Sequence, residues 1–401
     1  MQSLRVIQAV ENGANDYVIR VLTSPLEVNA LEWDCLLALE PHWSPFMRHA
    51  YLAALHSSGS AVAGTGWAPR FMTLWRDGIL HAACPLYLKD HSYGEYVFDW
   101  AWANAYHQHG VAYYPKAVAA VPFTPVPGVR LLARDDAARA VLVQALVAWC
   151  QQEKLSSLHL LFAGDADVAA CAQAGLMLRH TVQFHWENAN YSSFDEFLAT
   201  LNQEKRKKIK QERRRVADAG VTFRRSLGRD ITQCDWDFFY RCYERTYYEH
   251  GNAPYLNRDF FTRMAHTMPE NWLLFVAERN EKPIAASLIA IGTHPEDATA
   301  RVAYGRYWGA LERVDCLHFE ACYYQPLQWC IEHGVGSFEG GAQGEHKMAR
   351  ALMPVKTTSA HWLAHPAFAD AVERFLEREG QGIAGYLDDL GQRSPFRAPR
   401  G

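Results

Sequence analysis

The sequence predicts two α/β (α+β) units in tandem, each with a mixed, mostly antiparallel sheet flanked by helices. The chain has 401 residues, which is enough for two or three compact units that each bury a core. Its hydrophobic content of 49% and charged content of 21% are those of an ordinary globular protein. A further observation is an internal repeat, in which helices precede a hairpin twice along the chain.

The repeat centres on two hairpins. An apolar strand, a polar turn and a second strand occur both in FMTLWRDGILHAACPLYLK at 71–89 and in WLLFVAERNEKPIAASLIAIG at 272–292. Helical stretches lie upstream, at 45–59 before the first hairpin and at 236–251 and 259–268 before the second. The agreement indicates an internal duplication, with the copies about 200 residues apart.

The rest of each unit alternates helices and strands. In the first unit, a loop region rich in proline and aromatic residues precedes a helix, a strand, a second helix and a second strand: 91–130, then 136–151, 156–162, 165–175 and 176–186. The second unit repeats the order more compactly as a strand, a helix and a strand: 298–309, 317–334 and 335–341. Pro326 should kink that helix, because an interior proline costs ~3 kcal/mol. We therefore place the units at 1–190 and 191–391, followed by a disordered tail at 392–401.

Charge, cysteine content and hydropathy narrow the class of protein. The formal net charge is -4 at pH 7, so any contact with nucleic acid has to be local. The nine cysteines include no C-x-x-C pair, which fits a reducing compartment better than a disulfide framework. The N-terminus lacks the apolar core of a signal peptide, and no run reaches the ~18 apolar residues of a membrane helix. We expect a cytoplasmic protein without a membrane span, and the sequence leaves its oligomeric state open.

A strongly basic run occupies 204–215, EKRKKIKQERRR, with eight basic residues in twelve. A capping box that begins at Ser193 starts a helix before it, and Ile209 and Val216 recur at helical spacing. Two interpretations stay open. The charges can cover a solvated helix face, or cations such as Lys207 can contact the phosphates of a substrate or of RNA. Contact with RNA would show as an affinity that falls steeply with salt.

The second unit also holds the densest group of polar and aromatic side chains. The chain has no G-x-S-x-G elbow, no P-loop, no H-E-x-x-H and no zinc-type array. His318 and Cys322 are four residues apart and share a helix face, so a Cys–His nucleophile pair competes with a structural cysteine. Glu339, Glu345 and His346 lack a second spacing signature, and we predict no metal site. The remaining members of the group are Arg306, Tyr307, Trp308, Glu320, Gln343 and Lys347.

The stretch FEGGAQGEHK, 338–347, places glycines directly after an apolar strand. Gly340, Gly341 and Gly344 allow a positive φ or the close approach of another group to the backbone. Backbone N–H groups in such a turn can face an anion or a developing oxyanion, and Lys347 adds a point charge nearby. The alternative is a tight β-turn with solvent-facing polar residues.

Aromatic and charged residues also gather in the first unit, at 92–110 and 113–116. Tyr106 and Lys116 belong to these two segments. The composition suits the wall of a binding cleft and equally a small core beneath a long loop.

Several of these segments, in this order, resemble the C-terminal unit of the FemABX-type aminoacyl transferases. They are a basic helix, a Tyr-rich helix, a hairpin, an amphipathic helix and a strand that runs into an acidic, glycine-rich turn: KRKKIKQERRRVADAG (205–220), YERTYYEHG (243–251), KPIAASL (282–288), LQWCIEHG (327–334) and SFEGGAQGEHK (337–347). The chain as a whole is more similar to the proteobacterial FemAB-like family of peptidoglycan biosynthesis or recognition proteins. That likeness covers roughly 26–376 and rests on HSYGEYVFDWAW, YYPK, PFTPVPGVRLL, QFHW, GRYWG, LHFEACYYQ and GAQGEHKMAR.

The resemblance implies two fused GNAT-like units with a cleft between them. It also implies acyl transfer, in such proteins typically from an aminoacyl-tRNA to the amine of a peptidoglycan precursor. In the Fem transferases a lysine after the last strand lies near the reacting acyl group, and Lys347 matches it by position within a different context, GEHKMAR. A GNAT enzyme that uses acetyl-CoA usually carries a [QR]-x-x-G-x-[GA] loop. The segment from Arg306 to Leu311 begins that pattern but ends in leucine, which disfavours CoA.

We therefore expect an acyltransferase without a permanently bound cofactor, whose acyl donor is a co-substrate: aminoacyl-tRNA or, less favoured, acetyl-CoA. Lys347 and backbone N–H groups near Gly341 would hold the oxyanion, and Glu345 or His346 would accept the proton. A tRNA would meet the basic helix at 205–215. The expected substrate-binding residues are Arg306, Tyr307, Trp308, His318, Glu320, Glu339, Gly341, Gln343, Tyr106, Lys116 and Lys207. The alternative is a non-catalytic protein that recognises a cell-wall precursor or tRNA.

Overall fold

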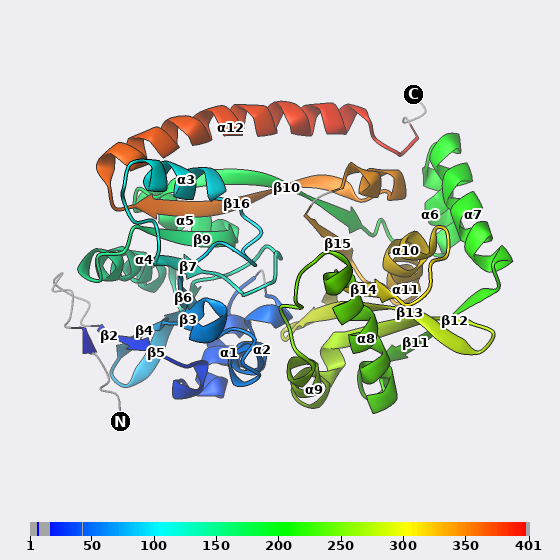
Figure 1. The fold of residues 1–401 in the computed structure, drawn as a ribbon, viewed down its shortest axis with the longest axis horizontal. Helices are drawn as coiled ribbons and strands as arrows, with labels where there is room; N and C mark the ends of the chain where they lie inside the picture. Colours follow the sequence, from blue (N-terminus) through cyan, green and yellow to red (C-terminus); the bar gives the residue numbers. More distant parts are fainter. Residues whose placement is uncertain (1–5, 8–16, 42, 343, 398–401) are drawn as a thin grey trace. The chain divides into compact units, whose positions relative to one another are not determined.

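The computed structural model describes residues 6–7, 17–41, 43–342 and 344–397 (Figure 1). The chain divides into two compact units. Unit 1 consists of Met1–Thr181 and Lys356–Gly385, and unit 2 consists of Val182–Val355 and Tyr386–Gly401. Each unit thus contains two separate pieces of the chain, whereas the sequence suggested one boundary between 190 and 191. The difference arises because the chain passes from one unit to the other inside two continuous strands, Met177–Glu187 and Met353–Leu363, and inside the helix Pro366–Gln392, none of which interrupts a local pattern.

Unit 1 contains two sheets. The first is antiparallel and has the order β1-β2-β4-β5-β8: Val6–Ile7, Val18–Leu22, Phe71–Arg76, Ile79–Cys84 and Leu132–Ala133. The second has the order β10-β16-β9-β7-β6-β3: Met177–Glu187, Met353–Leu363, Ser157–Ala163, Lys116–Ala119, Leu86–Lys89 and Trp67–Pro69. Within it, β7 and β9 run parallel, while β16 with β9, β6 with β7 and β3 with β6 run antiparallel.

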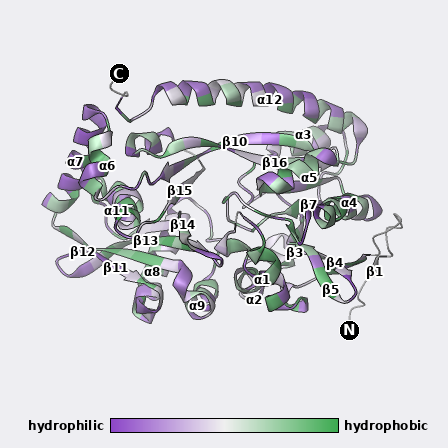
Figure 2. Cartoon of the chain, turned by 180° about the vertical axis from the view of Figure 1, so that it is seen from behind, coloured by the Kyte–Doolittle hydropathy of each residue, from purple (hydrophilic) through white to green (hydrophobic). Residues whose placement is uncertain are grey.

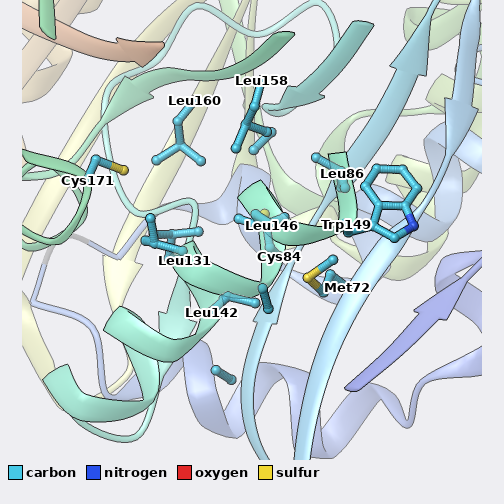
Figure 3. Close-up of a cluster of buried hydrophobic side chains, with 14 of the residues drawn as sticks. Met72, Cys84, Leu86, Leu131, Leu142, Leu146, Trp149, Leu158, Leu160 and Cys171 are labelled. Atoms are coloured by element: carbon cyan, nitrogen blue, oxygen red, sulfur yellow. The ribbon is translucent and has the colours of Figure 1, made fainter. Parts of the chain in front are cut away.

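The helices of unit 1 are α1 to α5 and most of α12: Ala30–Ala38, His49–Ser57, Trp100–Gln108, Asp136–Gln152, Asp165–Gln173 and Pro366–Gln392. Asp135 caps α4 by accepting a hydrogen bond of 2.7 Å from the Ala138 N–H. The apolar stripe of α4 then packs with strand residues into one core, whose members include Leu142, Leu146, Trp149, Met72, Leu131 and Leu158 (Figure 3).

The first predicted hairpin is confirmed only in part. Strands β4 and β5 pair as expected, but the second strand ends at Cys84 and β6 begins at Leu86 in the other sheet. Pro85 lies between them, and a residue without an N–H cannot continue a ladder of hydrogen bonds.

The strands of unit 2 follow the order β11-β12-β13-β14-β15-β10: Val221–Leu227, Trp272–Arg279, Lys282–His294, Asp297–Ala310, Ser337–Ala342 and Met177–Glu187. Strand β10 is named with both units because the division between Thr181 and Val182 falls inside it. All neighbours are antiparallel except β14 and β15. The predicted hairpin at 272–292 corresponds to β12 and β13 and is confirmed. The predicted fold class, a mixed and mostly antiparallel sheet with helices in each of two tandem units, is therefore confirmed.

The helices of unit 2 are α6, α7, α8, α9, α10, a π-helix and α11: Phe194–Thr200, Gln203–Asp218, Gln233–Glu249, Arg258–Thr267, Leu317–Phe319, Glu320–Tyr324 and Gln325–Glu332. Figure 2 shows α7 as mainly hydrophilic and β12 and β13 as mainly hydrophobic, which agrees with a helix that exposes most of its surface to solvent and a hairpin that is buried. The core of the unit includes Phe184, Trp186, Phe275, Leu327 and Phe338.

The end of the chain differs from the predicted disordered tail over its described part. The Asn202 N–H donates to the carbonyl of Pro395 at 2.9 Å, and the Arg397 N–H donates to that of Thr200, also at 2.9 Å. Leu201 forms a β-bridge with Phe396. Residues 398–401 lie outside the described residues. Among the helices that the structure describes, none combines the length and apolar character needed to cross a membrane.

Candidate active site

A pocket of about 130 Å³ opens in unit 2 where β13, β14 and β15 meet the helical segment formed by α10 and the π-helix. Its lining residues come from all four elements: Ser287, Ile289, Gly305, Arg306, Tyr307, Trp308, His318, Cys322, Tyr323, Phe338 and Gly340. Four of the predicted substrate-binding side chains are thus brought together at one place: Arg306, Tyr307, Trp308 and His318.

The pocket lies where β14 and β15 separate. Their parallel register joins Val302–Tyr304 to Ser337–Glu339, and within the described residues no further pair follows. A glycine comes next on each strand. A side-chain Cβ on Gly305 would lie 3.0 Å from the ring of Phe338, and one on Gly340 would lie 2.9 Å from the carbonyl oxygen of Phe184. At Gly340 the neighbouring backbone therefore leaves no room for a larger residue, whereas at Gly305 a side chain would require the ring of Phe338 to shift.

Lys347 is buried directly behind the glycine turn of β15. It lies in the 3₁₀ segment Glu345–Arg350 and is 5% exposed. Its Nζ donates to the carbonyl oxygens of Gly340 at 2.6 Å and of Gly341 at 3.1 Å. Burial lowers the pKa of Lys347 to about 8. The lysine thus holds a cationic group against the pocket residue Gly340 and fixes the turn at the same time.

The two predicted proton acceptors beside Lys347 do not line the pocket. Glu345 is exposed and accepts hydrogen bonds from the Tyr386 hydroxyl at 2.9 Å and from Arg393 Nη1 at 3.0 Å. His346 is exposed too, with its Nε2 3.3 Å from the Tyr323 hydroxyl. Glu345 is thus engaged by Tyr386 and Arg393, while His346 contacts the lining residue Tyr323 without lining the pocket itself, which the sequence alone did not reveal.

A buried ion pair, which we did not anticipate from the sequence, supports the 3₁₀ segment. Arg350 is 1% exposed, and its Nη2 lies 3.0 and 2.8 Å from the two carboxylate oxygens of Glu212 on α7. Arg350 also donates to the carbonyl of His346 at 2.7 Å, and its guanidinium lies 3.5 Å from the ring centroid of Phe319. The Tyr324 hydroxyl donates to Glu212 as well. The sequence contained one indication of this ion pair. Glu212 falls at the spacing of the apolar face of α7, and a carboxylate that is buried on such a face needs a partner.

A comparison with protein families identifies the group. The model of the FemAB-like family, described as peptidoglycan biosynthesis/recognition, matches residues 24–398. The chain belongs to this family. No curated protein matches the chain.

Solved structures share the fold of this FemAB-like protein at low sequence identity. FemX is 11% identical with a TM-score of 0.52, covering 86% of this chain and 98% of its own. The C-terminal domain of a putative lysylphosphatidylglycerol synthetase from Agrobacterium fabrum is 12% identical with a TM-score of 0.54, covering 87% and 96%. L-PGS from Bacillus licheniformis is 12% identical with a TM-score of 0.52, covering 87% and 97%. At these identities the likeness concerns the fold.

Three other predicted substrate-binding residues of unit 2, Glu320, Glu339 and Gly341, lie outside the pocket lining of the FemAB-like chain. Glu320 is buried and paired with Arg213 at 3.0 Å. Glu339 faces His185, with 3.9 Å between its Oε2 and the histidine Nε2. Gly341 contributes the carbonyl that Lys347 binds and has a φ of 74°. Gln343 lies outside the described residues.

The two predicted residues of unit 1 are buried within that unit. Lys116 is 0% exposed, and its Nζ donates to Ser92 Oγ and Glu95 Oε2, each at 2.8 Å, and also to Asp99. Tyr106 is 1% exposed and stacks on Phe368 with ring centroids 3.9 Å apart. This placement corresponds to the core alternative, because an ammonium with three acceptors and a covered ring are structural contacts.

The basic run forms the outer face of α7. Its exposed cations are Lys207, Lys208, Lys210, Arg214 and Arg215. Lys210 and Arg214 have acidic neighbours, Asp195 at 3.7 Å and Asp218 at 3.4 Å. Lys207 and Lys208 form no ion pair with the described residues. The solvated-face interpretation therefore describes the geometry, and the same face is accessible to a polyanion.

The titratable groups that line the pocket differ in protonation. Burial raises the pKa of Cys322 to about 12 and that of Tyr323 further, so both keep their protons near neutral pH. A thiol of that kind does not act as a nucleophile, which disfavours the Cys–His pair. His318 behaves in the opposite way, since burial of its ring, with smaller contributions from His346, Arg350 and Lys347, lowers its pKa to about 4. Within the described residues, no group of three His, Cys, Asp or Glu side chains is arranged to hold a metal.

Proposed function

We propose that the protein is an acyltransferase that moves a small acyl or aminoacyl group from an activated donor to an amine of a cell-wall precursor. The observation on which the proposal depends is the pocket between β14 and β15 together with Lys347, which does not line the pocket itself but donates a hydrogen bond of 2.6 Å to the carbonyl of the lining residue Gly340. Membership of the FemAB-like family supports the cell-wall acceptor.

The size of the pocket limits what can enter it. Its volume of about 130 Å³ is close to the ~150 Å³ of an engineered protein cavity that binds benzene. Sites for whole cofactors or drug-sized ligands measure ~300–1,000 Å³. The pocket therefore accommodates the acyl end of a donor, and the nucleotide or nucleic-acid part has to lie outside it.

In this proposal the amine attacks the acyl carbon, and negative charge develops on the acyl oxygen. Lys347 would stabilise that charge, because a preorganised cation in a buried setting interacts more strongly with it than water does. The pKa of about 8 leaves the lysine mostly protonated at neutral pH. Arg306 and Trp308 would position the acyl group, since both line the pocket.

The exposed cations of α7 support aminoacyl-tRNA as the donor. Lys207 and Lys208 are exposed and form no ion pair with the described residues, so their charges are accessible to phosphates. Acetyl-CoA remains the competing donor, because an acetyl group also fits a pocket of this size.

The test supplies the purified protein with labelled aminoacyl-tRNAs and acetyl-CoA in parallel and follows transfer to amines of cell-wall precursors. We expect transfer from aminoacyl-tRNA and a loss of about 10²–10³ in kcat/KM for Lys347→Met, which preserves the volume but removes the charge. Lys282→Ala is the matched control, because Lys282 is an exposed lysine of the same unit at the start of β13.

Three results would contradict parts of the proposal. Unchanged kcat/KM in a folded Lys347→Met variant removes the lysine from the mechanism. Transfer from acetyl-CoA alone replaces the donor. Saturable binding of a precursor without turnover of any donor indicates a recognition protein instead of an enzyme.

A further inference from the structure

The helix behind the pocket contains a π-helical turn at the place where Pro326 interrupts its hydrogen bonds. In an α-helix the N–H of residue 326 would donate to the carbonyl of Cys322, and proline has no N–H. The structure forms a π-helix over Glu320–Tyr324, in which the Gln325 N–H donates to the carbonyl of Glu320, five residues back. Such turns are rare and occur frequently at functional sites.

The π-helix contributes Cys322 and Tyr323 to the pocket, and α10 directly before it contributes His318. His318 as a whole residue is exposed at the pocket mouth, but three aromatic rings cover much of its imidazole and shield that ring from water: Trp308 at 5.6 Å, Phe319 at 5.6 Å and Tyr323 at 5.7 Å between centroids. These contacts come from β14, from α10 and from the π-helix, so the ring is held in place at the pocket mouth.

Desolvation of the ring is the main reason that the pKa of His318 is lowered, and the positive charge around it acts in the same direction. The 3₁₀ segment contributes three groups that oppose its protonation, His346, Arg350 and Lys347, and Arg306 of β14 lines the same pocket. The acidic residue of the π-helix, Glu320, is paired with Arg213. A neutral imidazole has one nitrogen that accepts a proton.

The other lining groups cannot take that role. Cys322 and Tyr323 keep their own protons, and Arg306 is a permanent cation. Glu345 and His346, the acceptors expected from the sequence, do not line the pocket. Among the described side chains that line it, His318 is therefore the group with a basic nitrogen available near neutral pH.

We infer that His318 is the proton acceptor and donor of the acyl transfer, a role that rests on the proposed function. As the amine nitrogen bonds to the acyl carbon, the carbonyl electron pair moves onto oxygen and an N–H proton passes to the imidazole. When the carbonyl re-forms, the bond from the acyl carbon to the donor's oxygen breaks, and the imidazolium returns the proton to that oxygen. An imidazolium whose pKa is lowered is more acidic than an ordinary one, which favours this second transfer.

The experiment compares wild type, His318→Ala, His318→Gln and His333→Gln with aminoacyl-tRNA as the donor. His333 is the matched control, because it is an exposed histidine directly after α11 that stacks on Trp329 and does not line the pocket. We expect His318→Ala to lose about 10²–10⁴ in kcat with KM within about threefold of wild type, as for loss of a general acid–base group. Added imidazole should restore part of the kcat of His318→Ala, because the pocket mouth is open, and should not restore that of Lys347→Met.

The outcomes separate the two levels of the argument. If wild type transfers acyl groups and folded His318→Ala or His318→Gln stays within about threefold of its kcat, the inference about His318 fails and the proposed function stands. A loss of kcat that added imidazole does not restore also overturns the inference about His318, and so does a loss of kcat/KM that comes from a higher KM. Either result assigns His318 to positioning. If wild type transfers from no donor, the proposed function fails and the role of His318 fails with it.

Discussion

The Glu212–Arg350 pair allows a quantitative test of how the site is held together. Glu212→Gln keeps the shape of the side chain but removes the charge that neutralises a guanidinium that is 1% exposed. Breaking a buried ion pair by removing one partner costs about 3–5 kcal/mol, because an uncompensated charge remains in the interior. Arg350 retains its hydrogen bond to the His346 carbonyl and its contact with the ring of Phe319, so we expect the lower end, about 3 kcal/mol.

A loss of that size lowers Tm by about 6–12 °C, because 1 kcal/mol corresponds to roughly 2–4 °C for a unit of this length. Calorimetry of the full chain measures it. The control is Glu332→Gln, which breaks the exposed pair between Arg225 and Glu332, 2.6 Å apart, and should cost no more than about 1 kcal/mol. The double variant Glu212→Met with Arg350→Met should regain much of the loss, since replacing both partners by apolar residues leaves no unpaired charge. Equal Tm shifts for Glu212→Gln and Glu332→Gln would refute the reasoning.

Three further predictions follow from other parts of the structure. Alanine substitution of four exposed cations of α7, Lys207, Lys208, Arg214 and Arg215, should weaken the binding of aminoacyl-tRNA. The slope of log K against log salt should fall by about one for each phosphate that is no longer neutralised. The control Lys282→Ala should change neither the affinity nor the slope. The charge of Lys347 is present below its pKa of about 8 and disappears above it, so kcat/KM should fall as the pH rises through about 8, and this limb should be missing from the pH profile of Lys347→Met. Gly380→Ala and Gly382→Ala should each stabilise α12 by about 0.5–1 kcal/mol in thermal unfolding, because an added Cβ meets nothing within 4 Å, and destabilisation would show an unforeseen need for glycine.

Local patterns in the sequence predicted most of the elements and several residues that line the candidate pocket. The spacing of apolar residues located the second hairpin and α4, and the glycines after an apolar strand located the turn beside Lys347. Pro326 was expected to kink its helix. It does more than that, since the missing N–H is accommodated by a π-helical turn that brings His318 and Cys322 to the pocket.

Contacts between distant parts of the chain could not be predicted in the same way. Glu212 and Arg350 are 138 residues apart, and no periodic pattern links them. The directions of Glu345 and His346 depend on a 3₁₀ turn whose hydrogen bond from the Lys347 N–H to the Gly344 carbonyl has no distinct sequence signature. Lys116 was assigned to a cleft because charged residues are mostly exposed, whereas three polar partners from the preceding loop allow its burial.

The interleaving of the chain between the two units determines how the protein can be cut or expressed. A gene truncated after residue 190 would encode unit 1 without β16 and α12, although both belong to that unit. Strand β9, whose seven residues are all buried, would lose the partner on one side and present an apolar edge. Exposed apolar edges of this kind promote aggregation. Neither half of the gene is therefore an independent folding module, and a separately folding unit 1 requires the segment that begins at Lys356 to be joined to it.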